Sequence, residues 1–96
     1  MITINAIPKI IHGTSASRRL RLENMFPAII YGGNHPPIFL ILDHNIVIKL
    51  EEQSKFFTEK LLLIVNKKEN YVKVKEIQHH PFKSKIIHID FIRVEL

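Results

Sequence analysis

Short apolar runs, each ended by a proline, a glycine pair or a polar cluster, recur along the whole chain. ITINAIP stops at Pro8, AIIY is followed by Gly32 and Gly33, and IFLIL is followed by polar residues. Isoleucine is frequent in these runs, and its β-branched side chain favours strands. The runs predict a mixed but mainly β fold with six short strands and two or so short α-helices. A small closed β-barrel is the economical way to hide the edges of so many short strands.

The breaks between the runs place the expected elements. Strands are expected at residues 2–8, 28–31, 38–42, 71–77 and 86–94, and FFTEKLLLIV, residues 56–65, is expected to start a further strand. A short helix should precede Asn24, with Ser15 or Ser17 as its N-cap and Asn24 and Pro27 ending it.

A second helix is expected in DHNIVIKLEEQS, because its apolar residues shift from strand spacing to helical spacing. Asp43 or His44 would cap it. Ile46 and Leu50, with Val47 beside them, should line its buried face.

Alternation along the last two strands sorts their side chains into two faces. The core face is expected to hold Val72, Val74, Ile87, Ile89 and Phe91. The outward face is expected to hold Lys73, Lys75, His88 and Asp90.

The chain has 96 residues, which indicates a single domain over residues 1–96. It has no cysteine, which excludes disulfides and thiolate metal sites. Its first residues lack the basic and apolar pattern of a signal peptide, and no apolar run is long enough to span a bilayer. A cytoplasmic protein that does not enter membranes is expected.

The net charge of +5 and the isoelectric point near 9.7 favour an anionic partner. The excess is uneven: residues 1–42 carry four Lys or Arg against one Glu, residues 43–63 carry three against four acids, and residues 64–96 carry seven against four. If the two basic ends meet in the fold, they form one positive face.

The densest positive charge lies in the expected first helix. Ser17, Arg18 and Arg21 share one helical face, and Arg19 lies to its side. Glu23 is the one acidic residue nearby. Guanidinium groups without acidic partners are suited to bidentate contacts with phosphate, although a merely solvated basic helix is the alternative.

The outward strand residues extend this surface. Tyr31 ends the second strand and offers a ring for stacking or a hydroxyl for a sugar or base edge, unless it is an ordinary partly buried tyrosine. A basic helix beside a polar strand face suits shaped RNA better than straight B-DNA. The His88 and Asp90 pair could serve acid–base chemistry, but there is no nucleophile motif or glycine-rich phosphate loop, so an enzyme is not expected. The histidines are too scattered to predict a metal site.

The ordered set ASRRLR, FPAIIYGG, LDH, Q-x-HP and HIDF resembles the L twenty-five, or CTC, family of bacterial ribosomal proteins. The resemblance runs from TINA to HIDFIRV, and the chain looks like the short, single-domain form. It implies a six-stranded barrel in the large ribosomal subunit that binds 5S ribosomal RNA at an irregular, magnesium-rich internal loop and the adjoining stem. It further implies no cofactor held by the protein, magnesium associated with the RNA, and a monomer when free.

Carried over to this chain, the resemblance implies a set of RNA contacts that overlaps the polar faces described above. The expected RNA-binding residues are Lys9, Ser17, Arg18, Arg19, Arg21, Tyr31, Lys73, Lys75, His79, His88 and Asp90.

The chain departs from the family pattern at four of its residues. Thr14 replaces a lysine, Ser15 replaces a glycine, and His79 stands where an arginine is usual, while Lys75 adds charge where a neutral polar residue is common. The alternative to RNA binding is a protein-interaction barrel whose basic surface meets an acidic protein.

Overall fold

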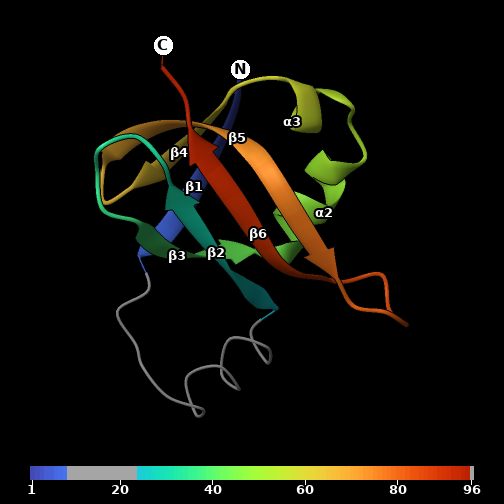
Figure 1. The fold of residues 1–96 in the computed structure, drawn as a ribbon. Coiled ribbons are helices and arrows are strands. Elements are labelled where there is room, and N and C mark those ends of the chain that lie inside the picture. The colour runs from blue at the N-terminus through green and yellow to red at the C-terminus, as the bar shows by residue number, and fades with distance from the viewer. Residues whose placement is uncertain (9–23, 96) are drawn as a thin grey trace.

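The computed structural model describes residues 1–8 and 24–95. Six strands in these ranges form a closed barrel in the order β1-β3-β2-β6-β5-β4 (Figure 1). The strands are β1 (Ile2–Pro8), β2 (Met25–Tyr31), β3 (Ile38–Asp43), β4 (Leu61–Val65), β5 (Lys68–His79) and β6 (Ile86–Arg93). The prediction of a mainly β, six-stranded closed barrel is confirmed. The expected first helix lies outside the described residues, together with its caps Ser15 and Ser17.

Two parallel pairings close the ring of strands. β1 pairs with β4 in parallel and β2 pairs with β6 in parallel, whereas the other four pairings are antiparallel. β4 and β5 are joined by Asn66 and Lys67, both with positive φ, as in the two-residue hairpin turn that follows strand twist.

The barrel interior is filled by apolar side chains from every strand and both described helices. The fully buried members with the largest side chains are Phe56, Phe91, Ile30, Leu40, Leu42, Leu61, Leu63, Ile89, Val47 and Val72. Val72 is buried and Val74 packs against this core, as expected from the alternation in β5.

β2 begins earlier than the sequence indicates. The expected strand covered residues 28–31, but the observed strand starts at Met25 and includes Pro27. Pro27 is tolerated because β2 pairs with β3 alone at that point, and its pairing with β6 starts at Ala28.

The helix α2 (His44–Glu51) confirms the second expected helix, and Asp43 is its N-cap, with a side chain that accepts from the Ile46 N–H at 3.3 Å. The expected buried face is partly wrong. Ile46 is 53% exposed, whereas Val47 is fully buried. The side of the helix against the barrel is therefore centred on Val47 rather than on Ile46.

The expected strand at residues 56–65 is wrong in its first half. Residues Lys55–Thr58 form the short helix α3, and β4 begins at Leu61. Phe56 is buried in the core and its neighbour Phe57 is 45% exposed, and the two rings meet edge to face. In this helical turn the side chain of Phe56 points into the core and that of Phe57 lies partly in solvent.

The expected inward position of Ile87 is also wrong. Ile86 is buried and Ile87 is 42% exposed, whereas Ile89 and Phe91 are buried as expected. The register shifts between Gln78 and His79, so Ile87 has no direct partner on β5. A bulge adds a residue and reverses the alternation on one side of it.

Candidate nucleic-acid interface

The outward face of β2, β6 and β5 brings several expected RNA-binding residues together. Tyr31 lies opposite Ile92, and Ile92 lies opposite Lys73, so these three side chains form one row across the three strands. Adjacent strands are about 4.8 Å apart, so Tyr31 and Lys73 are separated by about 10 Å. We call the exposed side of these strands the β2–β6–β5 face.

Asp90 and His88 lie on the same face of β6, as expected. Asp90 is two residues from Ile92 and lies opposite Ile29 on β2 and Glu76 on β5. His88 Nδ1 lies 3.0 Å from Asp90 Oδ1, with 31% and 32% of the two side chains exposed. The carboxylate and the imidazole are thus in contact, and part of each side chain is accessible to a ligand.

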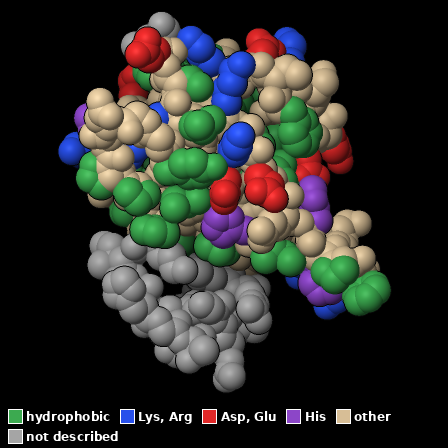
Figure 2. All heavy atoms as spheres, viewed as in Figure 1, with side chains coloured by type: hydrophobic (Ala, Val, Ile, Leu, Met, Phe, Trp, Pro, Cys, Tyr) green, Lys and Arg blue, Asp and Glu red, His purple; other side chains and the backbone are tan. Residues whose placement is uncertain are grey.

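Lys73 and Lys75 of β5 are both exposed. Lys73 belongs to the row with Tyr31, whereas Lys75 lies at a register shift between Val74 and Glu76. The shift turns Glu76 to the side of Asp90. Figure 2 shows the outcome: basic, acidic and histidine side chains lie close together over this face.

Sequence reasoning missed Glu76 and Gln78 as members of this face. Glu76 opposes Asp90 and Gln78 opposes His88, and both side chains are exposed. Simple alternation from Lys73 and Lys75 would turn Glu76 inward, and nothing in the sequence marks the bulge. The result is a face of mixed charge, which is suited to hydrogen bonding with base edges as well as to phosphate contacts.

His79 is not brought into this group. Its Nε2 lies 2.7 Å from Glu51 Oε2, so its side chain is engaged with the end of α2. The same position opposes the buried Ile86 rather than the outward row. His79 therefore joins β5 to α2.

The remaining expected contacts cannot be placed on this face. Lys9, Ser17, Arg18, Arg19 and Arg21 lie outside the described residues, as do the departures at Thr14 and Ser15.

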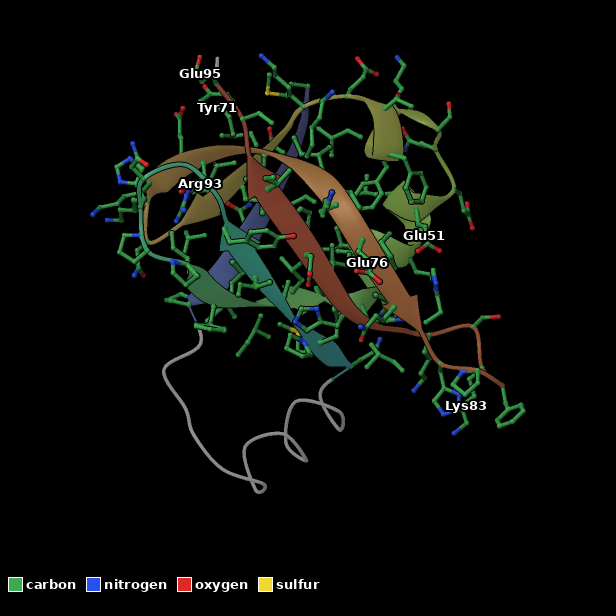
Figure 3. All side chains as sticks on the ribbon, viewed as in Figure 1. Glu51, Tyr71, Glu76, Lys83, Arg93 and Glu95 are labelled. Carbon is green, nitrogen blue, oxygen red and sulfur yellow. The ribbon has the colours of Figure 1, made fainter. Side chains whose placement is uncertain are left out.

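Arg93 is a cation of β6 that is committed within the protein. Its guanidinium donates to the carbonyls of Gly32, His35 and Pro36, and thereby holds the β2–β3 loop (residues 32–37) against the barrel. Gly32 has a φ of +103°, and a Cβ there would come within 3.0 Å of Ile92. The loop after Tyr31 is thus fixed by both glycine geometry and the Arg93 donors. Figure 3 shows Arg93 beside this loop.

Two side chains in residues 1–8 and 24–95 have shifted pKa values: His44 begins α2, and Tyr71 lies two residues before Lys73 on β5. Burial, followed by the charge of Lys85, lowers the pKa of His44, whose Nε2 accepts from the Ile86 N–H at 3.0 Å. The hydrogen bond from the Tyr71 hydroxyl to Glu69 raises the pKa of Tyr71.

No three histidine or acidic side chains in residues 1–8 and 24–95 are grouped so as to hold a metal ion. None of the helices in these ranges has the length and apolar character required to cross a membrane.

Comparison with known proteins identifies a match over most of the chain. The model of the ribosomal L25p family matches residues 4–91. The chain is 52% identical over 93 residues to the large ribosomal subunit protein bL25 of Proteus mirabilis. The aligned region covers 97% of this chain and 99% of that protein. The bL25 protein of Sodalis glossinidius is 50% identical over 93 residues, with the same coverage. That of Serratia proteamaculans is 48% identical over 94 residues, covering 98% of this chain and all of that protein.

Proposed function

The chain belongs to the ribosomal L25p family, and from this membership we propose that it binds 5S ribosomal RNA at an irregular internal loop and the adjoining stem. It is a protein of the large ribosomal subunit, and it resides with the ribosome in the bacterial cytoplasm. The family is one of ribosomal proteins and not of enzymes, in agreement with the sequence prediction.

The observation that carries the RNA proposal is the β2–β6–β5 face. Three neighbouring strands present a tyrosine, two lysines and a histidine–aspartate pair on one exposed side of a rigid barrel. A ring, cations, an oriented imidazole and carboxylate acceptors are the groups used to recognise unpaired or non-standard bases.

The acidic members of the face have a role in this proposal that differs from phosphate binding. A carboxylate repels phosphate but accepts hydrogen bonds from the amino groups of bases. Asp90 and Glu76 would therefore read base edges, and Lys73 and Lys75 would contact the backbone. The arginine-rich segment around Arg18, which lies outside the described residues, would supply the main phosphate contacts of the stem. Magnesium ions would associate with the RNA and not with the protein, and the free protein would be a monomer.

The experiment is a binding titration of the protein against 5S RNA and against a version whose internal loop is replaced by regular base pairs. With roughly four to six phosphate contacts, the logarithm of the affinity should fall by about 3–5 units per tenfold rise in salt. The intact RNA should bind more tightly than the altered one at every salt concentration. Equal affinities for the two RNAs would refute recognition of the internal loop and leave only general attraction to polyanions.

A further inference from the structure

The loop between β5 and β6 (residues 80–85, HPFKSK) holds an aromatic side chain in solvent. Phe82 is 90% exposed, more than any other large apolar side chain in residues 1–8 and 24–95. Single exposed apolar side chains are common on protein surfaces, but loops carry a disproportionate share of binding residues, and this ring lies in a loop that also carries Lys83 and Lys85.

Internal hydrogen bonds hold this loop in one shape. The His80 N–H donates to the Lys85 carbonyl at 2.8 Å, and the Lys85 N–H donates to the Lys83 carbonyl at 2.7 Å. The Phe82 N–H donates to His80 Nδ1 at 3.1 Å, and the two rings lie edge to face at 6.3 Å. A preformed loop loses little conformational entropy when Phe82 contacts a partner.

The base of the loop is tied to the rest of the barrel. The Ile86 N–H, directly after the loop, donates to the buried His44 at the start of α2. Phe26 packs edge to face against the same His44 ring, at 6.0 Å between centroids. The loop therefore projects from a rigid support.

The charge of the loop selects the kind of partner. It contains Lys83, Lys85 and His80 and no acidic residue, and both lysines are exposed. An apolar protein partner would have to bury or neutralise these cations, whereas RNA offers a base to the ring and phosphates to the lysines. A ring flanked by cations is the arrangement by which proteins bind unpaired nucleotides.

The loop also continues the β2–β6–β5 face. His88 follows Lys85 by three residues along β6, which is about 10 Å in an extended strand. Figure 3 shows Lys83 at the far end of the β5–β6 hairpin, away from Arg93 and Glu95. A nucleic acid bound to His88 and Asp90 could therefore extend over the loop.

We infer that residues 80–85 form a second RNA contact, in which the Phe82 ring stacks on an unpaired base and Lys83 contacts a flanking phosphate. This inference rests on the proposed binding of 5S RNA and adds a site on a separate loop. The contact requires an unpaired or flipped-out nucleotide next to the part of the RNA that binds the β2–β6–β5 face.

The first test compares Phe82→Ala, Phe82→Leu and Phe82→Tyr in titrations against 5S RNA. Removal of a stacking ring should weaken binding roughly 5- to 100-fold, and Leu should be nearly as weak as Ala because it lacks a flat face. Phe82→Tyr should bind like the native protein. The salt slope should stay the same in all three variants, whereas Lys83→Gln should lower it by about one unit.

A second test uses the absence of tryptophan from the chain. Phe82→Trp introduces a single indole fluorophore, whose emission should be quenched by stacking when 5S RNA is added. The matched control is Phe57→Trp, at an exposed phenylalanine on α3, whose emission should change little.

The outcomes separate this inference from the proposed function. Native affinity in Phe82→Ala, with weakened binding in Asp90→Ala, would overturn the loop contact and leave the strand-face proposal standing. Native RNA affinity together with poor incorporation of Phe82→Ala into large subunits would also overturn it, because the loop would then dock on a protein. Loss of affinity in the Ala and Leu variants, with quenching of the indole emission in Phe82→Trp but not in Phe57→Trp, would support it.

Discussion

Two charged side chains of β6, Asp90 and Arg93, are partnered in different ways. Asp90 contacts the ring of His88 on a partly exposed face, and part of each side chain is accessible to a ligand. Arg93 directs its donors to three main-chain carbonyls of the β2–β3 loop. Of the two, Asp90 is suited to recognition and Arg93 to holding the loop that follows Tyr31.

Arg93→Lys should lower the free energy of unfolding by about 1–3 kcal/mol, since a compact ammonium group does not reproduce the planar fork whose two nitrogens contact three carbonyls of the loop. Urea denaturation measures this change. Lys73→Met, which removes an exposed cation from the neighbouring strand, is the control and should change stability by less than about 0.5 kcal/mol. Equal effects of the two substitutions would show that the carbonyl contacts contribute little.

Asp90→Ala should reduce the preference for intact over loop-altered 5S RNA and change the salt slope little, because a base contact carries discrimination and neutralises no phosphate. Paired titrations with the two RNAs measure the preference. Tighter binding of both RNAs to the variant would mean that Asp90 only repels the backbone.

At the scale of elements, the sequence predicts most strands and α2 from local chemistry. The predictions are wrong where contacts between distant parts of the chain determine the conformation. The cap at Asp43 and the apolar runs were sufficient to place α2 and most strands. The FF pair at Phe56 and Phe57 looks like strand sequence, but the short helix α3 forms there, with Phe56 buried and Phe57 partly exposed. Ile87 was misplaced because the register shift beside it depends on pairing between strands.

The candidate site was predictable to a similar degree. His88 and Asp90 were placed on one face because two residues of separation suffice for that in a strand. Glu76 was missed because a bulge after Val74 reverses the alternation of β5. His79 has a contact with α2 that no local pattern reveals.

Phe56→Ala should cost about 3–5 kcal/mol of stability, the usual loss when a fully buried phenylalanine is truncated. Phe57→Ala, one residue along the same short helix, should cost far less because its ring is partly in solvent. Thermal or urea unfolding of the two variants measures the difference. Similar losses would contradict the assignment of Phe56 to the interior of the barrel.

The contact between α2 and β6 should make stability depend on pH. The pKa of His44 is lowered from its ordinary value of 6.5 by burial and then by Lys85, while Asp43 and Glu51 act in the opposite direction. As the pH falls below about 6.5, His44 becomes protonated in the unfolded chain before it does in the folded protein. The free energy of unfolding should therefore decrease as the pH falls from about 6.5 to the lower pKa of the folded protein.

His44→Gln tests this assignment, because glutamine can accept a hydrogen bond and does not titrate. The variant should show a flatter stability profile between about pH 7 and pH 5 than the native protein, with the difference measured by urea denaturation at each pH. The other histidines are present in both proteins, so their contributions largely cancel in the comparison. If the stability of the two proteins changed with pH in the same way, His44 would not contribute to the acid sensitivity of the fold.

At the scale of the whole molecule, the position of a charge matters more than the total of +5. Lys73 and Lys75 lie on the β2–β6–β5 face, whereas Lys55 begins α3. In Figure 1, α3 lies near the top of the view, whereas the loop between β5 and β6 lies at the lower right. A single bound RNA cannot be expected to use all these cations equally.

Lys73→Gln and Lys55→Gln lower the net charge by the same amount, but only Lys73→Gln should flatten the salt dependence of RNA binding, by about one unit. Titrations at several salt concentrations measure both slopes. An equal decrease in both would indicate diffuse attraction rather than a defined face.

The closed ring of six strands has a consequence for how the molecule can change over evolutionary time. Each strand has a paired neighbour on both sides, which limits the free edge to which a ligand could add a strand of its own. Affinity must come from outward side chains and from loops, and these can be exchanged without disturbing the pairing that fixes the frame. The barrel can therefore acquire or lose a preference for a given nucleotide through single surface substitutions, and its specificity can drift much faster than its architecture.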